Sequence, residues 1–105
     1  MPTDQYHEPA DELSAEIRTF ARMIASLQEE AEAIGWYEQR MSLEKDEQAH
    51  AIMEHAQREE FLHFAMSLEY LARRKDKWRV ALKNILFKDG DIVQNAEKAE
   101  DQVED

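Results

Sequence analysis

Apolar side chains recur along residues 13–34 at alternating spacings of four and three residues. The positions in this row are Leu13, Ile17, Phe20, Ile24, Leu27, Ala31 and Ile34. Such a heptad pattern predicts an amphipathic helix over residues 10–40 that packs this row against another helix. A second apolar row runs beside the first and contains Phe20, Met23, Leu27, Ile34, Tyr37 and Met41. The combined face is wider than one neighbouring helix needs, which indicates burial against more than one partner helix.

Helical spacing returns after a short connection and predicts a second long helix over residues 43–74, with Ser42 as its N-cap. Its expected buried row contains Ala49, Ile52, Met53, Ala56, Phe64, Ser67, Leu68 and Leu71. A shorter helix is expected over residues 76–88, and the chain breaks at Gly90. Two long helices with a tight connection form an antiparallel hairpin. The predicted fold class is therefore all-α, an antiparallel two-helix hairpin plus a short third helix.

Charge and composition limit the possible partners. Residues 1–90 are expected to form one domain, and residues 91–105 an acidic, mobile tail with at most nascent helix. The net charge of −11 argues against nucleic acid as a partner, because phosphate binding needs clustered Lys and Arg. The chain has no cysteine, which excludes disulfides and thiolate metal sites. It shows no signal peptide and no apolar run of ~20 residues, so we expect a soluble, cytoplasmic protein with no membrane partner.

Glu60 and His63 stand three residues apart and lie in line with the apolar row of the second helix. Burying an ionised carboxylate without a partner is costly, so an inward-facing Glu needs an explanation. A turn near residue 45 places Glu30 of the first helix opposite Glu60. Di-iron four-helix bundles use one Glu from each of two helices and a Glu-x-x-His pair from each of the other two. One chain supplies half of this set, and two copies would make four helices with four carboxylates and two histidines. The other half of the site is therefore expected in a second copy of the chain.

Simpler interpretations stand beside these candidates. A second Glu-x-x-His pair, Glu47 and His50, lies on a polar face and is interpreted as a solvated surface pair. Three residues on a face adjoining Glu30 have two possible roles: a solvated acidic strip beside an aromatic residue, or an approach that attracts ions to the site. They are Glu29, Glu32 and Trp36.

Two stretches of the sequence, EEAEAIGWYEQR (29–40) and HAQREEFLHFAMSLEYLARR (55–74), resemble the encapsulated ferritins. These are small ferritin-like proteins housed inside encapsulin nanocompartments, and the resemblance covers residues 7–90. It implies that two chains dock antiparallel into a four-helix bundle with a di-iron ferroxidase centre at their interface. It also implies a ring of ten chains, an encapsulin shell as partner, and a location inside that shell in the cytoplasm.

The resemblance further implies roles for single residues. The catalytic iron ligands would be Glu30, Glu60 and His63. The metal entry site would be formed by Glu29, Glu32 and Trp36. Tyr37 would lie close to the iron and hydrogen-bond a ligand, although a place in the core is the simpler interpretation. One departure concerns the end of the chain, AEKAEDQVED, which lacks the small apolar peptide that docks family members onto the shell wall. Either the chain is truncated or the localisation does not carry over.

The reaction expected on this basis is oxidation of Fe(II) to Fe(III) by dioxygen, with two irons at each dimer interface. Glu60 would bridge both irons, while Glu30 and His63 would each bind one. A rubrerythrin-like di-iron oxidase would share every ligand, but the chain has no cysteine-rich segment of the rubredoxin type. A non-catalytic helical assembly or metal-binding module would explain the heptads and the acidity, but not three inward-facing ligands at one level. Iron storage would be left to the shell, because an open ring cannot hold a mineral core.

Overall fold

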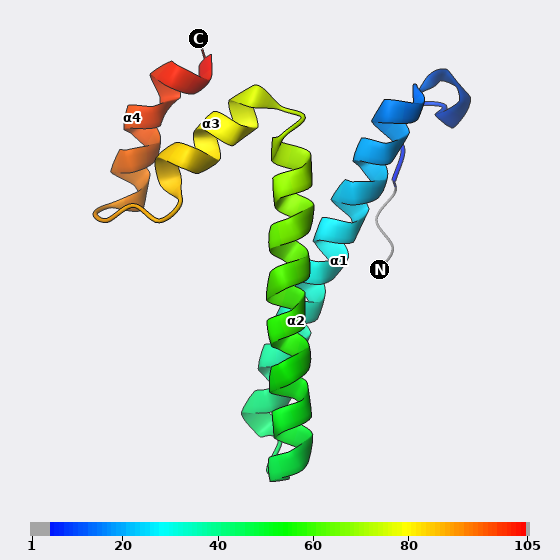
Figure 1. Cartoon of the computed structure of the whole chain (residues 1–105), viewed down its shortest axis with the longest axis vertical. Coiled ribbons are helices and arrows are strands. Elements are labelled where there is room, and N and C mark those ends of the chain that lie inside the picture. Colours follow the sequence, from blue (N-terminus) through cyan, green and yellow to red (C-terminus); the bar gives the residue numbers. More distant parts are fainter. Residues whose placement is uncertain (1–4, 105) are drawn as a thin grey trace. The chain divides into compact units, whose positions relative to one another are not determined.

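The computed structural model describes residues 5–104, and all regular structure in that range is helical (Figure 1). The elements are a short 3₁₀ helix (Ala10–Glu12), α1 (Ala15–Leu43), α2 (Glu47–Ala72), α3 (Asp76–Ile85) and α4 (Ile92–Glu104). The predicted all-α class is confirmed. The chain divides into two compact units, Met1–Glu69 and Tyr70–Asp105. No helix among the described residues is long and apolar enough to cross a membrane.

A serine cap sets the start of α1. The Ser14 hydroxyl oxygen accepts a hydrogen bond from the backbone N–H of Ile17 at 3.1 Å. This bond satisfies one of the N–H groups that have no partner within the first turn of a helix. Residues 10–12, which the apolar pattern places inside the helix, form the separate 3₁₀ turn before this cap. The helix then continues three residues beyond position 40, to Leu43.

An aspartate, and not Ser42, caps α2, so the N-cap predicted from the sequence is wrong. Ser42 lies in the last turn of α1, where its hydroxyl donates to the carbonyl oxygen of Gln39 at 2.6 Å. The Asp46 Oδ2 atom accepts from the backbone N–H of Ala49 at 2.8 Å, which fixes the first turn of α2. The connection is therefore short, and the two helices return alongside each other as an antiparallel hairpin (Figure 1).

Polar contacts join α1 to α2 at two levels of the hairpin. The buried Gln57 amide donates through Nε2 to the Ile34 carbonyl oxygen at 3.1 Å and to Glu38 Oε1 at 2.9 Å. Farther from the connection, the buried Ser67 hydroxyl donates to Glu30 Oε1 at 3.3 Å. Buried polar groups are costly when they lose their partners. Sliding one helix along the other would break these bonds, so they help to fix the register of the hairpin.

The hairpin leaves much of its apolar surface exposed. No residue of α1 is fully buried, and the second apolar row, Phe20 to Met41, is half-buried throughout. Ile52 was expected in the buried row of α2, but it is 68% exposed. The other large exposed apolar residues of these two helices are Ile17, Trp36, Leu43, Phe61, Leu62 and Met66. Apolar surface of this extent is typical of a protein–protein interface.

The second unit contains a helix that the sequence analysis did not predict. Residues 92–104 form α4, which packs against α3 and buries Ala99. The Asp91 side chain caps α4 by accepting from the backbone N–H of Gln94 at 2.9 Å. The Asn84 side chain on α3 donates to Gln102 Oε1 on α4 at 3.3 Å. The fold therefore has a fourth helix in addition to the expected three, while the mobility expected of residues 91–105 stays a prediction.

Two residues with left-handed backbone geometry connect α3 to α4. Gly90 has a φ of 95°, which glycine adopts without steric cost, and the predicted break at this position is confirmed. Phe87 has a φ of 60°, which is strained for a bulky side chain. The backbone leaves the helical conformation before this residue, so α3 ends at Ile85, three residues earlier than expected.

The Gln57 contacts lead to a testable prediction about stability. Replacing Gln57 with Ala removes the donor of two inter-helix hydrogen bonds, so we expect the free energy of unfolding to fall by about 1–2 kcal/mol. Chemical denaturation at one fixed chain concentration measures this change, since self-association would otherwise alter the result. Gln28→Ala is the matched control, because Gln28 is exposed on α1. Equal effects of the two substitutions would contradict a role for Gln57 in holding the hairpin together.

Candidate metal centre

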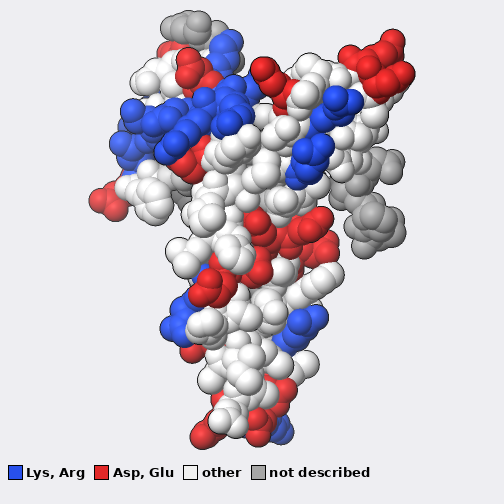
Figure 2. Space-filling model, turned by 45° about the vertical axis from the view of Figure 1, so that its right-hand side comes forward, with Lys and Arg blue, Asp and Glu red and all other residues white. Residues whose placement is uncertain are grey.

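An open pocket of about 340 Å³ lies between α1 and α2. Its walls are formed by Ser26, Glu29, Glu30, Ala33, Glu60 and His63. All three predicted iron ligands therefore line one pocket, as the height matching of the two helices suggested. Figure 2 shows acidic side chains gathered midway along the hairpin. Clustered carboxylates create a negative potential that raises the local concentration of cations.

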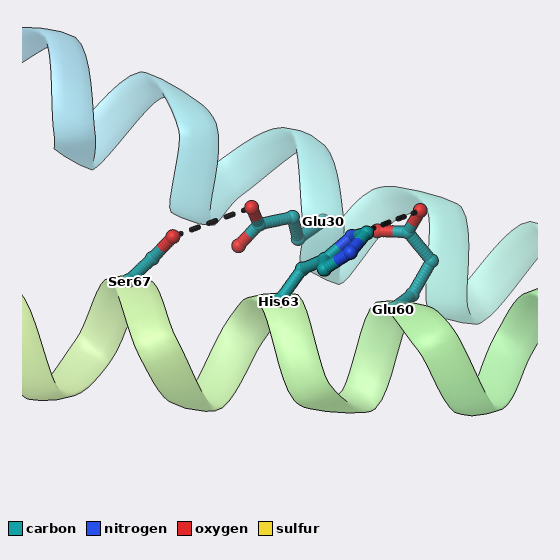
Figure 3. Close-up of polar contacts among 4 residues, drawn as sticks. All are labelled: Glu30, Glu60, His63 and Ser67. Atoms are coloured by element: carbon teal, nitrogen blue, oxygen red, sulfur yellow. Dashed lines mark hydrogen bonds and ion pairs between the residues drawn. The ribbon is translucent and has the colours of Figure 1, made fainter.

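Glu60 and His63 project from successive turns of α2 (Figure 3). The His63 Nδ1 atom lies 3.8 Å from Glu60 Oε1. The Glu60 side chain is 24% exposed, whereas the His63 side chain is 48% exposed. Glu60 thus faces the pocket, but α1 leaves about half of His63 uncovered. An imidazole in this position is accessible to a group from outside its own hairpin.

Glu30 projects from α1, and its two carboxylate oxygens have different surroundings. Oε1 accepts the hydrogen bond from Ser67, as Figure 3 shows. Oε2 is buried from solvent and has no hydrogen-bond partner in the structure. Removing a carboxylate oxygen from water without a donor or a cation beside it costs free energy. This oxygen is the buried side-chain polar atom that lacks a hydrogen-bond partner among the described residues.

A single chain does not bring the three candidate ligands together into a complete metal site. Across residues 5–104, no three His, Cys, Asp or Glu side chains are close enough to hold a metal ion. The reason is the direction of side chains on helices, which tilt toward the N-terminus of their own helix. The Glu30 carboxylate extends toward Ser67, whereas the Glu60 carboxylate lies beside His63 (Figure 3). Two residues at equal height on the helices therefore have carboxylates at different heights.

The donor types nevertheless suit a metal ion of the iron class. Carboxylate oxygens and an imidazole nitrogen are ligands for iron, manganese and zinc. Two copies of the pocket would supply four carboxylates and two imidazoles, the set found in ferritin-like di-iron bundles. The donor chemistry and the unpaired oxygen of Glu30 both fit such a group.

The other residues singled out in the sequence lie around the pocket to different extents. Glu29 is exposed and lines the pocket, and Glu32 is exposed on the same helix. Trp36 is 49% exposed. Tyr37 is half-buried, and the guanidinium of Arg40 lies 5.4 Å from the centre of its ring. The entry role of the first three, and the role of Tyr37 beside a metal ligand, stay predictions.

Two polar residues at the α1–α2 contact were missed as functional candidates. The sequence analysis names Ser67 only as a member of the buried row of the second helix, and it does not name Gln57. Both are buried, and both donate to α1. The available signal was the presence of polar residues at inward positions of an apolar helix face, where each needs a hydrogen-bond partner.

Comparison with known proteins places the chain among ferritin-like proteins. Residues 5–89 match the sequence model of a family described as EncFtn-like. A ferritin-like protein of Thermotoga maritima is 46% identical over 95 residues, which are 90% of this chain and 83% of that protein. An encapsulated ferritin-like protein of Rhodospirillum rubrum is 42% identical over 87 residues, which are 83% of this chain but 62% of that protein. These matches confirm the resemblance indicated by residues 29–40 and 55–74.

A solved structure agrees with these sequence matches. The crystal structure of a protein from Nitrosomonas europaea superposes with a TM-score of 0.81 at 43% sequence identity. The superposition covers 85% of this chain and 99% of the other. The shared fold thus extends over most of the helical structure described above.

The uncompensated oxygen of Glu30 predicts that this residue destabilises the metal-free protein. Glu30→Gln keeps the shape of the side chain but removes its charge, so we expect the free energy of unfolding without metal to rise by about 1 kcal/mol. Glu29→Gln is the matched control, because it makes the same change in net charge at an exposed neighbour. Thermal unfolding in the presence of a chelator measures both variants. A larger loss of stability for Glu30→Gln than for the control would contradict this interpretation.

Proposed function

The chain belongs to the EncFtn-like family, and we propose that it is a ferroxidase that oxidises Fe(II) to Fe(III) with dioxygen at a di-iron site shared by two chains. The observation that carries this proposal is the buried, unpartnered Oε2 of Glu30 in a pocket that also contains Glu60 and His63. A bound divalent cation would compensate this oxygen. A purely structural assembly would not explain why a buried carboxylate oxygen has no hydrogen-bond partner.

Iron is the substrate in this reaction, and the protein holds two ions side by side. The Glu60 carboxylate has two oxygens and can face one ion with each, while Glu30 and His63 each bind a single ion. Four carboxylates from two chains balance the charge of two Fe(II) ions. Each Fe(II) loses one electron, and one dioxygen molecule takes up both electrons and two protons to give hydrogen peroxide. Pairing the ions lets dioxygen gain two electrons together and avoids release of superoxide.

A second copy of the chain is the proposed partner that completes the site. His63 is partly exposed, and the exposed apolar residues Leu62 and Met66 lie beside it on α2. A copy related by two-fold symmetry would cover this apolar surface and bring a second set of ligands. Such pairing would produce the ferritin-like four-helix bundle expected from the sequence. We extend this proposal to a ring of ten chains built from such pairs.

We further propose that the protein works inside an encapsulin shell. The support is the name of the Rhodospirillum rubrum relative, an encapsulated ferritin-like protein. In this arrangement the chain oxidises iron, and the shell encloses the Fe(III) product as it forms mineral.

Replacement of Glu60 by Ala tests the ferroxidase proposal directly. Under anaerobic conditions, native mass spectrometry of the unaltered chain should show two Fe(II) ions for each pair of chains. Glu60→Ala should lose this binding, and oxygen consumption on adding Fe(II) should fall at least about tenfold, because the bridging ligand is gone. Glu47→Ala is the matched control, since Glu47 and His50 have the same spacing near the start of α2.

The outcomes separate the proposal from its alternatives. Equal iron uptake by both variants would exclude the site. An unaltered chain that binds no iron would leave a helical assembly module without chemistry. Iron binding with fast turnover only when a reductant and peroxide are supplied would favour a di-iron peroxidase or oxidase of the rubrerythrin type.

A change at the proposed dimer surface should abolish iron binding without altering a ligand. Met66→Glu places a charge on an apolar residue that is 66% exposed in the single chain. Burying that charge against a second chain would be costly, so we expect smaller assemblies and loss of paired iron binding in native mass spectra. Val93→Glu is the control, because Val93 is 65% exposed and lies on α4. Retention of dimers and iron by Met66→Glu would contradict this placement of the interface.

A further inference from the structure

Ser67 is a buried polar residue that the proposed chemistry leaves without a role. It lies on α2, four residues beyond His63, and is 5% exposed. Its hydroxyl donates across the hairpin to Glu30 Oε1 at 3.3 Å (Figure 3). A serine within a helix commonly donates to a carbonyl in the preceding turn of its own helix. Here the hydroxyl reaches instead to a carboxylate on the other helix.

We propose that Ser67 is a positioning residue for iron binding, which holds Oε1 of Glu30 and thereby leaves Oε2 as the oxygen that binds iron. This inference rests on the proposed function, because it takes Glu30 to be an iron ligand. Ser67 does not touch the iron in this arrangement. It acts through the orientation of the Glu30 carboxylate.

The two oxygens of Glu30 provide the argument for this division of roles. A glutamate side chain rotates about several bonds, so fixing its carboxylate costs conformational entropy. A hydrogen bond to one oxygen already restricts the carboxylate before the metal binds, so less conformational entropy is lost on binding. Groups that hydrogen-bond to a metal ligand in this way commonly orient it. The other oxygen is already out of contact with solvent and has no competing donor. It can therefore bind a cation without first losing a water molecule or a hydrogen bond.

The neutrality of the serine hydroxyl is also important. A lysine or arginine at this position would pair with Glu30 and compete with the metal for its charge. A hydroxyl donates one hydrogen bond and leaves the carboxylate negative. The observed 3.3 Å is long for a bond from a hydroxyl to a carboxylate, for which about 2.5–2.7 Å is usual.

Anaerobic titration calorimetry with Fe(II) on the full chain tests this inference. Ser67→Ala should weaken Fe(II) binding about tenfold, a typical effect of removing an outer partner of a metal ligand, with the number of ions per pair of chains unchanged. Ser67→Thr keeps the hydroxyl and should restore most of the affinity. Ser42→Ala is the control, because it removes a serine hydroxyl that donates to the Gln39 carbonyl, outside the pocket. Thermal unfolding of each variant shows whether it is folded.

A double substitution distinguishes positioning from a general structural effect. If Ser67 acts through Glu30, then Ser67→Ala should cause a smaller loss of Fe(II) affinity in the Glu30→Gln background, which keeps one side-chain oxygen as a weaker ligand. An equal loss in both backgrounds would overturn the inference, as would equal Fe(II) affinity of Ser67→Ala and the unaltered chain. If the unaltered chain binds no Fe(II), the proposed function fails and the inference fails with it. If the unaltered chain and Ser67→Ala both bind Fe(II) with the same affinity, the proposed function stands and only the positioning role of Ser67 is excluded.

Discussion

Two packed helices can cover only one side of each other, and this limit governs the α1–α2 hairpin. No residue of α1 is fully buried, and large apolar side chains such as Leu62 and Met66 remain exposed. A hairpin of this kind buries little apolar surface, so it gains little of the hydrophobic free energy that stabilises larger domains. The same limit leaves His63 half uncovered beside an open pocket. Exposed apolar residues and the half-covered His63 therefore lie near one another on α2, and the proposed second copy of the chain would cover both.

Buried polar groups help to hold α1 and α2 together and in register, a role that an apolar core has in larger proteins. Gln57 and Ser67 are buried and bind α1 through directional hydrogen bonds, which specify a register more sharply than apolar contact does. Glu30 shares in this arrangement through one oxygen only. Its other oxygen has no hydrogen-bond partner, so we expect it to destabilise the metal-free protein. Such local instability at a site that is otherwise well ordered is common where binding or catalysis takes priority over folding.

The sequence predicted the helical class and the hairpin, because apolar periodicity over long helices is a strong signal. Height matching on that hairpin then placed Glu30, Glu60 and His63 together, and all three line one pocket. It misplaced the cap of α2, since Ser42 and Asp46 are both good caps and only the backbone geometry decides between them. It missed α4 because many acidic residues obscure a short apolar row, of which Ala99 is buried. Its matching of Glu30 with Glu60 used only the distance of each residue from the turn and not the direction of the side chains. The contact with Ser67 arises from their tilt and requires coordinates to detect.

That tilt bears on why the proposed site needs two chains. Within one hairpin, the Glu30 carboxylate lies beside Ser67, whereas the Glu60 carboxylate lies beside His63. The three candidate ligands of one chain are therefore not gathered around a single point. In the proposed pairing, a second copy of the chain would bring its own Glu30, Glu60 and His63 to the pocket and supply the half of the ligand set that one hairpin lacks.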